Sequence, residues 1–151
     1  MILDLRAEAR KHAPRLPSLP ALRRAARETW RGRMINEHGS GRVFDALVSQ
    51  LSRAGFDDED VAECARFAGE ERTHGVLCGA VVEALGGEAR APIADPRALP
   101  EHRDVSLREA ALRNVISSPP RCPRPASDET RLVWEAVSAS RSDMLLVREA
   151  R

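Results

Sequence analysis

Apolar residues recur every three or four positions along two long stretches of this chain, which is the spacing of a helix with one buried face. In the first stretch, from Ala21 to Gly55, the recurring positions are Trp30, Met34, Glu37, Gly41, Phe44, Val48 and Leu51. In the second stretch they are Val61, Cys64, Ala68, Glu71, Gly75, Cys78, Val82 and Leu85. The pattern predicts two long helices, each with one face packed in the interior.

The turn between these helices carries clear end signals. Gly55 suits the left-handed conformation that often ends a helix, and Asp57 suits the N-cap of the next helix. Phe56 and Val61 have the spacing of a hydrophobic staple around that cap. We therefore expect a tight antiparallel hairpin over about residues 25–86.

Prolines divide the chain into three parts. Residues 1–20 are a basic lead interrupted by prolines, for which we expect a short helix followed by a strap. Residues 21–118 form the helical domain, and residues 119–151 form a Pro/Arg-rich joint with a weaker C-terminal helix. We expect this last part to contribute little to the fold.

A third, shorter helix is predicted near the end of the helical domain. Ser106 and Glu109 have the spacing of a capping box, which opens a helix. The pair Pro119-Pro120 prevents its continuation, so the helix spans about residues 106–117. The predicted fold class is all-α, with little strand.

Composition narrows the possible partners and the compartment. With 24 basic and 23 acidic residues the net charge is +1, and the chain has 3% aromatic residues and no tyrosine. These values disfavour a nucleic-acid partner. No stretch reaches the roughly 18 apolar residues of a membrane-spanning helix, so no membrane partner is expected. The three cysteines form no CxxC pair, which indicates a reducing cytoplasm.

Two glutamates stand at positions of the buried faces, where an uncompensated carboxylate is strongly unfavourable. Glu71 and His74 form an E-x-x-H motif, whose spacing lets both side chains address one point beside the helix. When residues are counted along each helix from the connection near residue 56, Glu37 lies within about one helical turn of the height of Glu71 and His74. Because two carboxylates and an imidazole suit iron or manganese, we predict that Glu37, Glu71 and His74 are metal ligands.

The same residues also allow an interpretation in which the protein binds no metal. Arg33, Arg42 or Arg72 could neutralise the two carboxylates, which would leave a helical scaffold or interaction module that packs on a partner helix. His38 is turned by about 100° from Glu37, so we expect it at the surface or behind the ligands.

Two segments resemble bacterial ferritin-like proteins, the di-iron carboxylate family: residues 30–37 and residues 67–74. In that superfamily a four-helix bundle binds two metal ions through a glutamate on helices one and three and an E-x-x-H on helices two and four. The resemblance implies that Glu37 is the first glutamate and that Glu71 and His74 are the first E-x-x-H. It also implies oxidation of Fe(II), or a related oxidase step, as the chemistry.

The resemblance covers about residues 25–117 and then ends. The family's third helix should run for some seven turns, whereas this one meets Pro119-Pro120 after about three. None of the remaining histidines forms a second E-x-x-H. A homodimer of two hairpins would supply the complete ligand set, as in two-helix members of the superfamily. The alternative is an inactive fragment that has lost its second hairpin, through a shifted reading frame or a diverged end.

Overall fold

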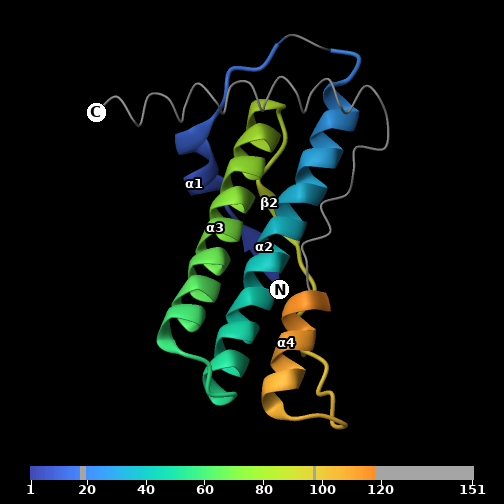
Figure 1. Cartoon of the computed structure of the whole chain (residues 1–151). Coiled ribbons are helices and arrows are strands. Elements are labelled where there is room, and N and C mark those ends of the chain that lie inside the picture. The colour runs from blue at the N-terminus through green and yellow to red at the C-terminus, as the bar shows by residue number, and fades with distance from the viewer. Residues whose placement is uncertain (18–19, 97, 118–151) are drawn as a thin grey trace, which may run out of the picture.

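The structure is a computed structural model that describes residues 1–17, 20–96 and 98–117 (Figure 1). Its elements are β1 (Ile2–Asp4), α1 (Arg6–Ala9), the 3-10 turn η1 (Arg10–His12), α2 (Arg23–Arg53), α3 (Asp58–Ala84), β2 (Arg90–Pro92) and α4 (Leu107–Ser117). The predominance of helix confirms the all-α prediction. The predicted C-terminal helix lies outside the described residues. In the described ranges no helix is both long and apolar enough to cross a bilayer.

The helices α2 and α3 form the long hairpin that the hydrophobic pattern predicts, and they lie side by side in Figure 1. The Asp57 carboxylate caps α3, since it accepts a hydrogen bond from the backbone N–H of Asp60 at 2.9 Å. Gly55 has a φ of 71°, the left-handed conformation expected of it. Phe56 and Val61 pack against the same apolar cluster. These contacts confirm the predicted turn.

Glycines allow the two long helices to approach closely in the middle of the hairpin. A Cβ atom at Gly41 would lie 3.1 Å from the carbonyl oxygen of Ala68, and one at Gly75 would lie 3.5 Å from that of Met34. A Cβ at Gly39, in contrast, would meet nothing within 4 Å. Close helix packing therefore explains Gly41 and Gly75 but not Gly39.

The N-terminal residues pack against the hairpin through a short antiparallel pairing of β1 with β2. Leu3 stands opposite Ala91, and both side chains are buried in the cluster that contains Met34 and Val82. Ala9 at the end of α1 is fully buried in that cluster. The predicted short helix is present, but the pairing of the two strands is not evident in the sequence, since three residues are too few for a recognisable alternation.

Arginines of α2 hold the segment after α3 alongside the hairpin. Each donates a hydrogen bond to a backbone carbonyl of that segment: Arg27 to Gly86 at 3.5 Å, Arg31 to Arg90 at 3.3 Å and Arg42 to Ala94 at 2.9 Å. These bonds satisfy carbonyl groups of a segment that, within the described part of the chain, pairs as a strand only with the short β1.

The helix α4 begins after Ser106 with one half of the predicted capping box, because the Glu109 carboxylate pairs with Arg113. The Oγ atom of Ser106 accepts a hydrogen bond from the backbone N–H of Glu109 at 3.2 Å. The observed start at Leu107 agrees with the prediction, and the described part of α4 reaches Ser117, the last residue before 118–151.

A buried asparagine joins α4 to the hairpin. Asn114 is fully buried, and its side-chain amide donates to the side-chain oxygen of Gln50 and to the carbonyl of Pro100, both at 3.0 Å. Its side-chain oxygen lies 2.9 Å from Nε2 of His102. Because every polar group of this side chain has a partner, the network positions α4 against α2 at little cost of desolvation.

Candidate metal centre

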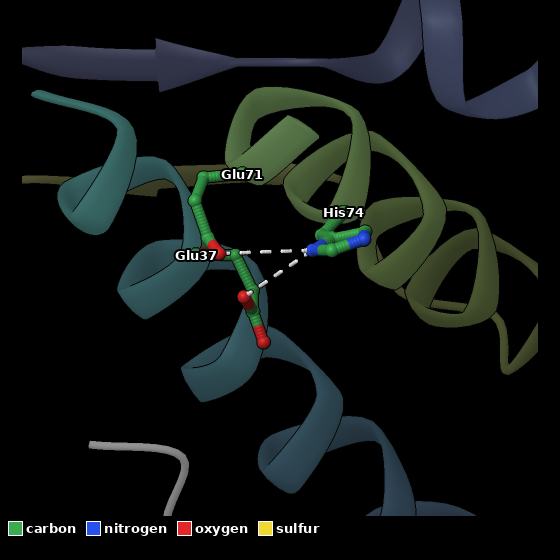
Figure 2. Close-up of side chains that lie close together, drawn as sticks. All are labelled: Glu37, Glu71 and His74. Atoms are coloured by element: carbon green, nitrogen blue, oxygen red, sulfur yellow. Dashed lines mark ion pairs between the residues drawn. The ribbon is translucent and has the colours of Figure 1, made fainter. Parts of the chain in front are cut away.

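The three predicted ligands converge between α2 and α3 (Figure 2). One ligand atom from each of Glu37, Glu71 and His74 can be chosen so that all three lie within 4.8 Å of one another. The Nδ1 atom of His74 lies 4.0 Å from Oε2 of Glu37 and 3.9 Å from Oε1 of Glu71. The structure therefore brings together all three residues that the sequence singles out.

Helix periodicity explains why these side chains point toward one another. Glu37 follows the buried Met34 by three positions on α2, and Glu71 follows the buried Ala68 by three positions on α3. Each glutamate therefore lies on the inward face of its helix. The tight turn between the helices sets their register, which places the two glutamates at one level.

The two carboxylates are mostly buried, and this makes their neighbourhood unfavourable for two negative charges. The side chains of Glu37 and Glu71 are 15% and 14% exposed, and Oε2 of Glu71 is buried without a hydrogen-bond partner among the described residues. Burial, followed by the hydrogen bond with Glu37 and its negative charge, raises the pKa of Glu71 to about 7. The Glu71 carboxyl is therefore about half protonated near pH 7.

An arginine lies beside this pair. Nη2 of Arg33 is 3.5 Å from Oε1 of Glu37, one turn along α2, and the Arg33 side chain is 13% exposed. The guanidinium carbon of Arg33 also lies 5.3 Å from the ring centroid of Trp30. Sequence reasoning names Arg33 as one of three arginines able to neutralise the carboxylates, without a signal that selects it.

The other two arginines are engaged elsewhere. Arg72 forms an ion pair across the hairpin with Asp45, and Arg42 donates to the carbonyl of Ala94. Of the three arginines considered, Arg33 is thus the one that the structure places against a predicted ligand.

His38 does not belong to the group of three, in agreement with its predicted place behind or outside the ligands. Its side chain is half-buried. Burial lowers the pKa of its imidazole, and the positive charges of Arg42 and Arg72 lower it further. His38 therefore adds no positive charge to this part of the protein at neutral pH.

Comparison of the chain with protein-family models, with curated proteins and with solved structures finds no match. The likeness to ferritin-like proteins thus remains a prediction based on residues 30–37 and 67–74, and the geometry of Glu37, Glu71 and His74 is the evidence for function.

Proposed function

We propose that the protein binds a divalent transition-metal ion, iron or manganese, through Glu37, Glu71 and His74. The observation that carries the proposal is the convergence of two carboxylates and an imidazole within 4.8 Å, at a place where one carboxylate oxygen is buried without a hydrogen-bond partner among the described residues. Oxygen ligands with one nitrogen ligand suit both metals.

The electrostatics of the site fit a cation. Two neighbouring, mostly buried carboxylates disfavour each other's charge, as the raised pKa of Glu71 indicates. A divalent ion between them would offset this repulsion and satisfy the buried oxygen of Glu71. The His74 side chain is 36% exposed, so the group is in contact with solvent on the side of His74.

If the bound ion is iron, the chemistry would be the oxidation of Fe(II) by dioxygen or peroxide. This is the chemistry that the ferritin-like resemblance implies. The protein's own residues would hold the ion and exchange a proton for it. Glu71 is the residue that releases this proton when an ion binds, because its carboxyl is about half protonated near pH 7.

A homodimer completes the proposal. One chain supplies three ligands, which leaves positions open on an ion of higher coordination number. Two hairpins that meet at the open His74 side would bring together two copies of Glu37 and of the Glu71–His74 pair. This is the ligand set that bundle proteins use for two metal ions.

A metal-free scaffold is the second candidate, and the ion pair between Arg33 and Glu37 favours it. In this interpretation Arg33 neutralises one carboxylate and a proton neutralises the other, so that no metal is needed. An inactive fragment would likewise bind no metal. Metal content and the mass in solution separate these candidates from the proposal.

The test is anaerobic reconstitution of the full chain with Fe(II) or Mn(II), followed by elemental analysis and measurement of the mass in solution. We expect about one ion per chain at most, and a dimer. Glu71→Gln should abolish binding. The matched control is Glu70→Gln, which changes the neighbouring exposed glutamate that pairs with Arg66 and should keep the metal. A metal-free monomer after reconstitution would contradict the proposal.

A further inference from the structure

We infer that Arg33 is a specificity-determining residue of this site: its fixed positive charge lowers the affinity for trivalent metal ions more than the affinity for divalent ones. The inference rests on the proposed function, because it concerns the ion that Glu37, Glu71 and His74 would hold. It goes beyond that function by assigning a role to a residue that is not itself a ligand.

The first support is that the two carboxylate oxygens of Glu37 face different partners. Its Oε1 atom faces Arg33, with Nη2 at 3.5 Å, whereas its Oε2 atom faces the ligand group, with Nδ1 of His74 at 4.0 Å. One carboxylate therefore lies between the guanidinium and the place where an ion would bind. Arg33 can stay paired with Oε1 while Oε2 binds the ion.

The second support is that the Arg33 charge is held in place. The side chain is 13% exposed, and its guanidinium carbon lies 5.3 Å from the ring centroid of Trp30, which is 7% exposed. A guanidinium remains protonated at all physiological pH values, and stacking on an aromatic ring restrains its position. An ion that enters the site thus meets a permanent positive charge.

The third support is the charge balance. Two carboxylates and an imidazole that bind an ion contribute two negative charges as ligands, and Arg33 reduces this sum to one. Repulsion between Arg33 and the ion grows with the ion's charge, so a trivalent ion is penalised more than a divalent one. At an effective dielectric constant of about 20 and a separation of roughly 6 Å, one unit of charge changes affinity by at least about tenfold, even with solvent screening. Arg33 would therefore shift the ratio of affinities toward the reduced form of a metal.

The experiment compares the binding of Mn(II) and Ga(III), in competition with nitrilotriacetate, to the full chain and to its variants. Arg33→Gln should raise the ratio of Ga(III) to Mn(II) affinity by about tenfold or more. Arg33→Lys keeps the charge and should restore most of the original ratio. Arg31→Gln is the control for overall charge, since Arg31 is exposed and donates to the carbonyl of Arg90, and it should leave the ratio unchanged.

Three results would overturn the inference: an unchanged ratio in Arg33→Gln, an equal shift in Arg33→Lys, or an equal shift in Arg31→Gln. Arg33→Met keeps the apolar stem over Trp30 and serves as a second neutral variant if the glutamine variant does not fold. If the unmodified protein binds neither ion, the proposed function itself fails. If it binds both ions and Arg33 does not affect the ratio, only the role of Arg33 is wrong.

Discussion

Glu37 and Glu71 come from different helices of the hairpin, and Nδ1 of His74 lies almost equally far from both carboxylates, at 4.0 Å and 3.9 Å. Two acidic side chains packed together in this way oppose folding unless a proton or a metal ion joins them. Burial, together with the hydrogen bond to Glu37 and the charge of Glu37, raises the pKa of Glu71 for this reason.

The first prediction concerns the stability of the metal-free protein at pH 8. Glu71→Gln should be more stable than the unmodified protein by about 1–3 kcal/mol, because it removes one of two facing charges. Glu37→Gln should gain less, or lose stability, because Arg33 would then lose its ion pair with Glu37. Urea unfolding in the presence of a chelator measures both. Equal destabilisation of the two variants would identify a structural ion pair in place of a metal site.

The second prediction is a pH dependence of stability that comes from Glu71. The pKa of this carboxyl is about 7 in the folded protein and 4.5 in the unfolded chain. Between these pH values the folded protein therefore binds more protons than the unfolded chain. Its stabilising contribution is therefore fully present below pH 4.5 and is lost as the pH rises through 7, by at most about 3 kcal/mol.

Unfolding free energies of the metal-free protein between pH 4.5 and 8 test this dependence. Glu71→Gln should show a flatter profile. Glu63→Gln should keep the original one, because Glu63 is exposed, pairs with Arg66 and does not contribute to the raised pKa of Glu71. Metal affinity should rise with pH over the same interval, because the ion replaces the proton. A profile that Glu71→Gln leaves unaltered would show that other groups cause it.

The third prediction concerns the buried network around Asn114. Asn114→Ala should destabilise the protein by about 2–3 kcal/mol, since it leaves the groups of Gln50 and Pro100 without this hydrogen-bond donor and creates a cavity. Leu112→Ala, at a position of the same helix that is 41% exposed, should cost less than about 1 kcal/mol. Equilibrium unfolding measures both, and equal effects would contradict the role given to the network.

The fourth prediction separates two glycines by their backbone conformation. Gly39 lies inside α2 with open space around it, so Gly39→Ala should stabilise the protein by about 0.5–1 kcal/mol. Gly55 has a φ of 71°, so Gly55→Ala should destabilise it by about 1–2 kcal/mol. Thermal or urea unfolding provides the comparison. A destabilising Gly39→Ala would indicate a contact at this position that the structure does not contain.

Local sequence determined the hairpin and its ends. The caps at Asp57 and Ser106 and the left-handed Gly55 each act within a few residues, so their effects can be deduced from the chain alone. The sequence also predicts that Glu37 and Glu71 lie at the same height along the hairpin, because the rise of an α-helix per residue is constant and the turn is short.

Only the tertiary structure decided which partners these elements have. The pairing of β1 with β2 uses backbone hydrogen bonds between distant segments, and such bonds leave no pattern of side chains in three residues. The choice of Arg33 over Arg42 and Arg72 depends on Trp30 and on the competing partners Asp45 and Ala94. A long side chain reaches many points from one backbone position, and the packing around it selects the point that it occupies.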